Sequence, residues 1–135
     1  MDTNAALEIV ATQHRAVLAT FRPDGTPQLT PVTVGVDDGR VIISTRETAY
    51  KVRNVLADPR VYLCVFPDEF FGRWIQIDGV ADIVHLPEAM DQLVEYYRRI
   101  RGEHPDWDEY RAAMERERRV IMRINISRVG PDKHG

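Results

Sequence analysis

The chain has 135 residues, 44% of them hydrophobic and 29% charged, with a formal net charge of −3, which fits one ordinary domain and excludes a disordered chain. The acidic balance gives no broad basic surface for nucleic acid, and no apolar stretch approaches the ~20 residues of a membrane helix. Cys64 is the single cysteine, so no intrachain disulfide can form, and residues 1–20 lack a signal-peptide pattern. We therefore expect one cytoplasmic domain over residues 1–135, with neither nucleic acid nor membrane as a partner.

The first part of the chain predicts a helix followed by a β-meander. The helix covers residues 5–13, with Asn4 available to cap its start. Three extended runs follow, at residues 16–21, 28–36 and 40–44. The turns between them contain Asp-Gly pairs, which are a strong hairpin signal.

The rest of the chain alternates between helices and strands. We expect a helix at 49–57 capped by Thr48, strands at 60–66, 73–84 and 120–126, helices from Pro87 to about residue 100 and over 108–117, and a loose polar tail from Gly130. Antiparallel strands with a few helices at the edge predict a barrel-like α+β domain.

Basic and hydroxyl residues gather around the start of the 49–57 helix. Lys51, Arg53 and Asn54 fall in its first turns, and Thr45, Arg46 and Thr48 precede it. A helix N-terminus offers unpaired N–H groups and the positive end of a dipole, which suit a phosphate or a carboxylate. This pattern predicts an anion site, and the alternative is a solvated basic helix face.

Residues 44–61, with the sequence STRETAYKVRNVLADPRV, resemble the phosphate-binding segment of the pyridoxamine 5'-phosphate oxidase-like split β-barrel superfamily. The resemblance extends to Thr30-Pro31-Val32 and to residues 76–81. The segment 97–114 is similar to the branch that uses the deazaflavin cofactor F420. Together these segments cover most of residues 14–129.

The resemblance implies an α+β fold, a flavin-binding split β-barrel with peripheral helices, which works as a homodimer with the cofactor site at the interface. It also implies a set of cofactor-binding residues: Thr30, Pro31, Val32, Ser44, Thr45, Arg46, Thr48, Lys51, Arg53, Asn54, Trp74, Gln76 and Gly79. Related F420 binders often carry a further basic residue two positions before the lysine. Ala49 stands there in this chain, and Arg46 is the candidate replacement.

The function that the resemblance implies is an F420-dependent reductase, which transfers a hydride from the reduced cofactor to a small conjugated substrate. Two alternatives stay open: an FMN-dependent oxidoreductase of the same fold, and a non-catalytic flavin or deazaflavin binder. Residues 127–131 lack the basic and aromatic C-terminal segment of true pyridoxamine-phosphate oxidases, which disfavours vitamin B6 oxidation. Hydride transfer is the cofactor's own chemistry, so no nucleophile–base pair is needed, and the sequence shows none.

Several reactive residue types receive structural interpretations. Cys64 lies in an apolar strand, which favours a buried thiol. His104 precedes Pro105 and is typical of a turn, and the four histidines show no paired zinc-ligand spacing. We expect Trp107 to pack between helices. Trp74 is a candidate either for a dimer contact or for the second subunit's cofactor pocket.

Overall fold

A computed structural model describes residues 1–135 and shows seven strands and four helices. The elements in chain order are α1 (Thr3–Val10), β1 (Arg15–Phe21), β2 (Pro27–Thr33), β3 (Gly35–Asp37), β4 (Arg40–Arg46), α2 (Tyr50–Ala57), β5 (Arg60–Phe66), β6 (Arg73–Val84), α3 (Met90–Arg101), α4 (Trp107–Arg116) and β7 (Arg119–His134). No helix combines the length and apolarity that crossing a bilayer requires.

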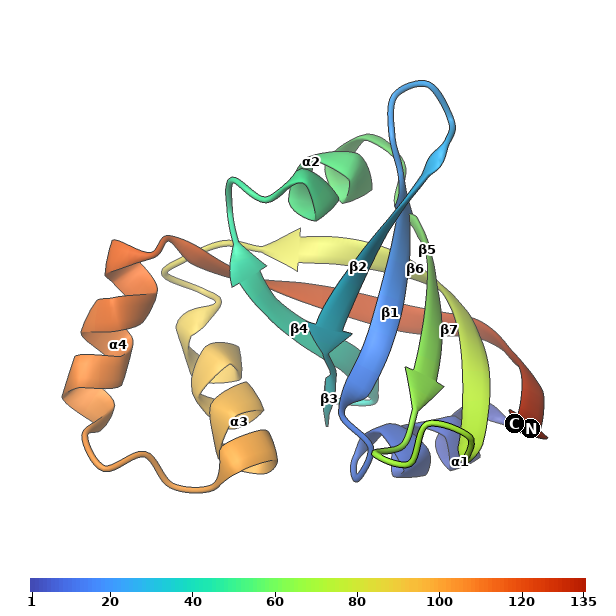
Figure 1. Cartoon of the computed structure of the whole chain (residues 1–135). Coiled ribbons are helices and arrows are strands. Elements are labelled where there is room, and N and C mark those ends of the chain that lie inside the picture. The colour runs from blue at the N-terminus through green and yellow to red at the C-terminus, as the bar shows by residue number, and fades with distance from the viewer.

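The strands form one curled antiparallel sheet in the order β2-β1-β5-β6-β7-β4-β3. Figure 1 shows the sheet wrapping around so that β2, at one end, comes back in front of β4, and residues of these two strands are in contact. The barrel is split there, because β2 and β4 are not hydrogen-bonded neighbours. The predicted α+β split β-barrel with peripheral helices is confirmed.

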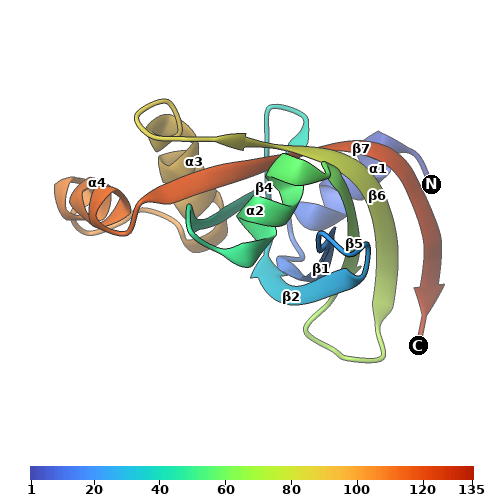
Figure 2. The ribbon, with the colours of Figure 1, turned by 90° about the horizontal axis from the view of Figure 1, so that it is seen from above.

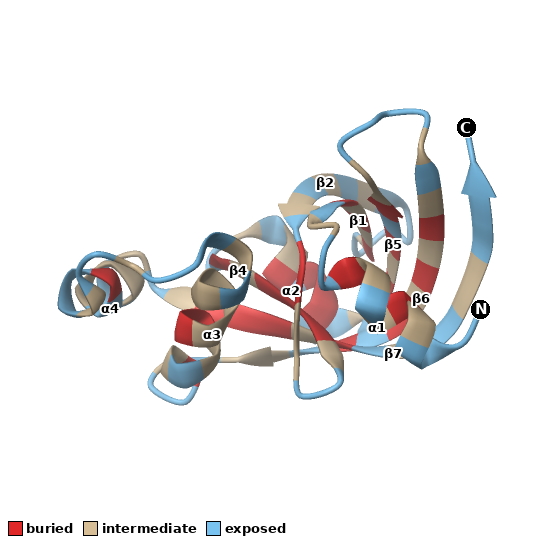
Figure 3. Cartoon of the chain, turned by 90° about the horizontal axis from the view of Figure 1, so that it is seen from below, coloured by how far each residue is buried: buried red, intermediate tan, exposed pale blue.

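Alternating side chains give the sheet two apolar faces. Val41 and Ile43 of β4 point into the barrel, where they pack with residues of β1, β5, β6 and β7. Ile42 of the same strand points outward and packs with Leu93 of α3 and Ile121 of β7. Figure 3 shows buried segments along the inner strands and on α3. The outer face of β4 and β7 is therefore the surface that holds the helical hairpin of α3 and α4.

The helices lie around the barrel in distinct places. Helix α1 contacts β3, β4 and β7, whereas α2 contacts β1 and β6. Figure 1 shows these two helices at opposite ends of the barrel. Figure 2 shows α3 and α4 set to one side, beside the ends of β4 and β7. The space between this hairpin and the barrel is where the candidate site lies.

Local sequence explains the turns that the strands need. Asp38 and Gly39, between β3 and β4, have φ values of 52° and 69°. A two-residue turn with both central φ values positive matches the twist of the flanking strands, which is why Asp-Gly is favoured there. Pro27 and Pro31 are tolerated in β2 because it is an edge strand, where a missing N–H does not interrupt the sheet.

Some sequence expectations are wrong. Asp2, not Asn4, caps α1, accepting from the N–H of Ala5 at 2.8 Å. The strand expected over 28–36 is divided into β2 and β3 by buried Val34. The tail from Gly130 is not loose, since β7 continues to His134 along β6. Arg73 of β6 holds this extension by donating to both carboxylate oxygens of Asp132, at 2.8 and 2.9 Å.

Candidate functional site

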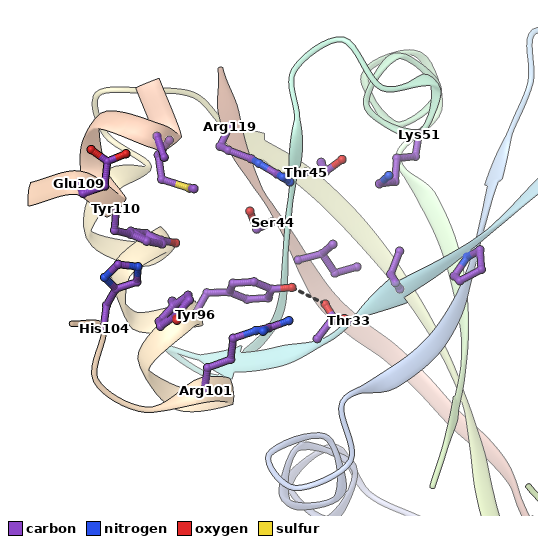
Figure 4. Close-up of a pocket in the computed structure, with 16 residues that line it drawn as sticks. Thr33, Ser44, Thr45, Lys51, Tyr96, Arg101, His104, Glu109, Tyr110 and Arg119 are labelled. Atoms are coloured by element: carbon purple, nitrogen blue, oxygen red, sulfur yellow. Dashed lines mark hydrogen bonds between the residues drawn. The ribbon is translucent and has the colours of Figure 1, made fainter. Parts of the chain in front are cut away.

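A cavity of about 660 Å³ lies between the barrel and the helical hairpin (Figure 4). Its size falls within the range of small-molecule sites. Its lining residues come from β2, β4, α2 and β7 on one side and from α3, α4 and their connection on the other. They are Pro31, Val32, Thr33, Ile43, Ser44, Thr45, Lys51, Tyr96, Tyr97, Arg101, His104, Glu109, Tyr110, Ala113, Met114 and Arg119.

The barrel side brings together five residues of the sequence prediction: Pro31, Val32, Ser44, Thr45 and Lys51. Strands β2 and β4 are in contact, and the cavity is lined by Pro31 and Val32 of β2 and by the hydroxyl-bearing Ser44 and Thr45 at the end of β4. In Figure 4 the Lys51 side chain points toward this space from α2. The apolar side chains of Pro31 and Val32 beside hydroxyl and ammonium donors suit a ligand that has both a ring and an anionic tail.

Lys51 carries the clearest electrostatic signal. Burial lowers the pKa of its ammonium, and the positive charge of Arg119 lowers it further. No carboxylate contributes to this shift. A half-buried lysine that lies beside a second cation and has no acidic partner is destabilised in its charged form. A bound anion would stabilise that charged form. The residues present therefore fit a phosphate-bearing cofactor.

Arg119 is the second cation, a residue that the sequence interpretation missed. It lies opposite Arg46 in the β4–β7 ladder, and both guanidinium groups donate to the carboxylate of Glu117. The Arg119 contact is 2.8 Å and the Arg46 contact 3.3 Å. Of these two arginines, only Arg119 lines the cavity. The second cation in the cavity with Lys51 is therefore Arg119, and not Arg46, which the sequence suggested as the replacement for the basic residue absent at Ala49.

The N-terminus of α2 differs from the expected capping. Its N-cap is Ala49, in an extended conformation and with no side-chain hydrogen bond, whereas Thr48 is exposed. The prediction that Thr48 caps this helix is wrong. No side chain satisfies the first N–H groups of α2, which leaves the positive end of the helix available next to Lys51.

Two tyrosines fix the helical wall of the cavity through their hydroxyl groups. Tyr96 of α3 donates to the carbonyl of Thr33 at 2.8 Å, which ties α3 to the end of β2. Tyr110 of α4 donates to the carbonyl of Leu93 at 2.8 Å, which ties α4 to α3. Burial raises the pKa of Tyr96, and it raises the pKa of Tyr110 to about 12. Both phenols therefore hold their protons at neutral pH and serve the structure of the wall.

An aromatic cluster continues this wall. Tyr97, His104, Trp107 and Tyr110 lie with neighbouring ring centroids 5.0–5.8 Å apart. The expected packing role of Trp107 agrees with these contacts. His104 does more than end a turn, because its ring belongs to the cluster and lines the cavity. None of these residues is among the cofactor-binding residues that the sequence predicts, because no local pattern brings α3, α4 and their connection to the barrel.

Other residues of the prediction lie outside this cavity: Thr30, Arg46, Thr48, Arg53, Asn54, Trp74, Gln76 and Gly79. Arg53 is exposed, with its guanidinium 5.7 Å from the centre of the Tyr50 ring. The buried amide of Asn54 donates to Thr20 Oγ1 at 3.0 Å and Gln28 Oε1 at 2.8 Å. That amide therefore links α2 to the first hairpin.

Gly79 has a packing role. A Cβ at this position would lie 2.6 Å from Cγ2 of Ile124 and 2.7 Å from the carbonyl oxygen of Asn125. The pairing of β6 and β7 shifts register between Asp78 and Gly79, and a glycine within a strand is typical of such a β-bulge. The close approach is thus made by the neighbouring strand β7.

Trp74 lines a second, largely apolar hollow of about 350 Å³ on another side of the barrel. Its other lining residues are Val17, Cys64, Phe66, Phe70 and Gly135. Cys64 is exposed, so the expectation of a buried thiol is wrong: Leu63 and Val65 take the inward positions of β5. Gln76 donates to the carboxylate of Asp78 at 3.0 Å.

Comparisons with known proteins agree with the fold and the resemblance. A conserved hypothetical protein of Mycobacterium tuberculosis is 30% identical, with 96% of this chain and 82% of that chain covered and a TM-score of 0.78. An F420 reductase is 25% identical, with 91% of this chain and 94% of that chain covered and a TM-score of 0.71. The heme storage protein HutZ of Vibrio cholerae is 16% identical, with 100% and 98% covered and a TM-score of 0.74, a likeness of fold alone.

The family model described as pyridoxamine 5'-phosphate oxidase matches residues 3–131. That match spans the barrel, the basic segment around Lys51 and the helical hairpin. The protein belongs to the pyridoxamine 5'-phosphate oxidase family.

Proposed function

We propose that the protein is an F420-dependent oxidoreductase that reduces a small conjugated substrate. The observation that carries this proposal is that two cations, Lys51 and Arg119, line one cavity. The charge of Arg119 acts on Lys51, and no carboxylate near Lys51 offsets it. The similarity to an F420 reductase over most of both chains supports the choice of cofactor.

Lys51 and Arg119 would hold the phosphate of the cofactor tail, assisted by the hydroxyls of Ser44 and Thr45. Pro31 and Val32 of β2 would pack against the ring system. When bound, the reduced deazaflavin supplies the hydride. The tyrosines of the helical wall keep their protons and hold α3 and α4 in place, which shields that side of the cavity from water.

The test is a pair of titrations that follow the quenching of tryptophan fluorescence by F420 and by FMN. Saturable binding of F420 with FMN at least tenfold weaker supports the proposal. Preference for FMN would move the protein to the FMN-dependent alternative. Tight F420 binding without turnover of any conjugated acceptor would favour the non-catalytic binder.

We also propose that the protein acts as a homodimer in the cytoplasm. Support comes from the apolar hollow around Trp74, beside which Phe70 and Phe71 are 77% and 72% exposed. Exposed apolar area of this kind is typical of subunit contacts. Light scattering would test the proposal by measuring the molar mass in solution. The unsubstituted protein should have the mass of two chains, and Phe70→Ser should shift that mass toward one chain. A mass of one chain for the unsubstituted protein would contradict the proposal.

A further inference from the structure

Arg101 is the only arginine in the last turn of α3 without a carboxylate partner. Arg98 pairs with Glu95 and Glu103, and Arg99 pairs with Asp37 and Glu95. Arg101 lines the cavity instead. A guanidinium group that faces a cavity without an acidic neighbour has its donors free for a ligand.

Arg101 and Lys51 serve different parts of the cavity. Figure 4 shows Lys51 entering from α2 and Arg101 from the end of α3, on opposite sides. The one acidic residue of the lining, Glu109, accepts from Arg116 at 2.9 Å and is thereby engaged. The cavity thus offers two separate cationic ends, and a cofactor phosphate at Lys51 leaves Arg101 for another anion.

Flat side chains line the same cavity as Arg101. The rings of Tyr97 and His104 both line the cavity, with centroids 5.0 Å apart. Met114 of α4 adds a flexible apolar side chain. Ring edges and faces of this kind accept a planar apolar group.

His104 adds one oriented donor. Its Nδ1 accepts from the backbone N–H of Asp106 at 2.9 Å. That bond occupies the Nδ1 lone pair, so the neutral ring carries its proton on Nε2. The Nε2–H is therefore available as a hydrogen-bond donor at the same wall.

We propose that this wall is a subsite for a planar organic anion, whose carboxylate or similar group binds Arg101 while its ring packs against Tyr97 and His104. The guanidinium fork matches two carboxylate oxygens, which favours a carboxylate over a single-point acceptor. The further idea that this anion is the hydride acceptor rests on the proposed function. The binding of the anion at Arg101 does not depend on it.

The test uses 2-naphthoate and its neutral analogue 2-naphthylmethanol as probes. The chain has two tryptophans, so an amide correlation spectrum contains two indole N–H signals. Trp107 contacts the rings that line the subsite, whereas Trp74 lines the other hollow. Trp74→Phe assigns the signals. We expect 2-naphthoate to shift the Trp107 signal saturably and 2-naphthylmethanol to bind at least tenfold more weakly.

Arg101→Gln should weaken 2-naphthoate by about ten- to a hundredfold and leave 2-naphthylmethanol unchanged. Arg111→Gln is the matched control, because Arg111 lies on α4 but lines a different hollow near Leu86 and Met90. Equal 2-naphthoate affinity in the Arg101→Gln variant and the unsubstituted protein would overturn the subsite. So would a loss caused equally by Lys51→Met.

F420 titrations of the same variants separate the subsite from the proposed function. Arg101→Gln should retain F420 affinity. If that variant loses F420 but not 2-naphthoate, Arg101 belongs to the cofactor tail and the subsite is wrong. If F420 fails to bind the unsubstituted protein while 2-naphthoate behaves as expected, the proposed function fails and the subsite stands.

Discussion

Lys51 of α2 and Arg119 of β7 direct two positive charges into one cavity, and burial together with the charge of Arg119 lowers the pKa of Lys51. The folded protein thus binds the Lys51 proton less tightly than the unfolded chain does. Stability from this group therefore increases as the pH rises from the lowered pKa toward 10.5, the ordinary value. At neutral pH the charge of Lys51 destabilises the free protein, and a bound anion offsets that effect.

Lys51→Met should weaken F420 binding by about ten- to a hundredfold, as the loss of a charge-assisted contact of ~1.5–3 kcal/mol requires. The substitution should not lower the stability of the protein without cofactor at neutral pH. Any increase in the free energy of unfolding should stay below about 1 kcal/mol, because solvent screens the half-buried charge of Lys51. Fluorescence titration and thermal unfolding measure the two effects. Lys133→Met, at the chain's other lysine, is the control. Unchanged F420 affinity would remove Lys51 from the site.

Arg119→Gln should also weaken F420 binding, whereas Arg46→Gln should not. Both arginines donate to Glu117, but only Arg119 lines the cavity. In the Arg119→Gln variant the pKa of Lys51 should rise, since the second cause of its lowering is gone. Carbon-13 labelling of the lysine ε-carbon gives two signals whose titration reports this change, and Lys133→Arg assigns them. A larger loss of F420 affinity in the Arg46→Gln variant would reverse the assignment.

The position of Arg119 explains why the sequence predicted only part of the site. Ser44, Thr45 and Lys51 are close in the chain, so one segment showed them together with a recognisable resemblance. Arg119 reaches the cavity because β7 pairs with β4 in a particular register, opposite Arg46. The register between two strands so far apart in the chain depends on the whole sheet. The residues around position 119 therefore do not predict that Arg119 lies opposite Arg46.

The same distinction applies to the fold. Asp38-Gly39 predicts its hairpin because the turn needs two positive φ values, a strictly local requirement. The polar end of β7 had no local signal for a strand, because its stabilising partners, such as Arg73, lie in β6. Cys64 was misplaced for a related reason: β5 is rich in apolar residues on both faces, so its composition did not show which face points outward.

Cys64→Ser should leave F420 affinity unchanged, because Cys64 lies in the hollow beside Trp74 and not in the cavity around Lys51. Cys64 is exposed, but the apolar hollow that it lines removes part of the water around its sulfur, and this partial desolvation raises the pKa of the thiol, so little thiolate is present at neutral pH. A disulfide reagent should therefore react slowly at pH 7 and faster as the pH rises above the ordinary thiol pKa of 9.0. Rapid labelling at pH 7, or loss of F420 binding by folded Cys64→Ser protein, would contradict this placement.

Gly79→Ala should destabilise the fold by about 1–3 kcal/mol, since the new Cβ would meet Ile124 and the backbone of Asn125 at under 3 Å. Denaturant unfolding measures the loss. Gly35→Ala is a graded control, because its Cβ would lie 3.3 Å from Cδ1 of Ile100, the far end of a side chain that can move. If Gly79→Ala kept full stability but lost F420 binding, Gly79 would be a cofactor contact and not a packing residue.

Tyr110→Phe should lower stability at neutral pH by about 1 kcal/mol, because the hydroxyl donates to the buried carbonyl of Leu93. Tyr50→Phe, at a side chain 70% exposed, should have little effect at the same pH.

The pH dependence gives the Tyr110 prediction its sign. Burial raises the pKa of Tyr110 from 10.0 to about 12, so the folded state keeps a proton that the unfolded chain loses in this interval. The stabilising contribution is complete below pH 10 and is lost as the pH rises toward 12. The stability difference between the unsubstituted protein and Tyr110→Phe should therefore shrink between pH 10 and 12 in denaturant unfolding. A constant difference across that interval would show that Tyr110 ionises alike in both states, and α4 would then pack less tightly on α3 than the Leu93 contact indicates.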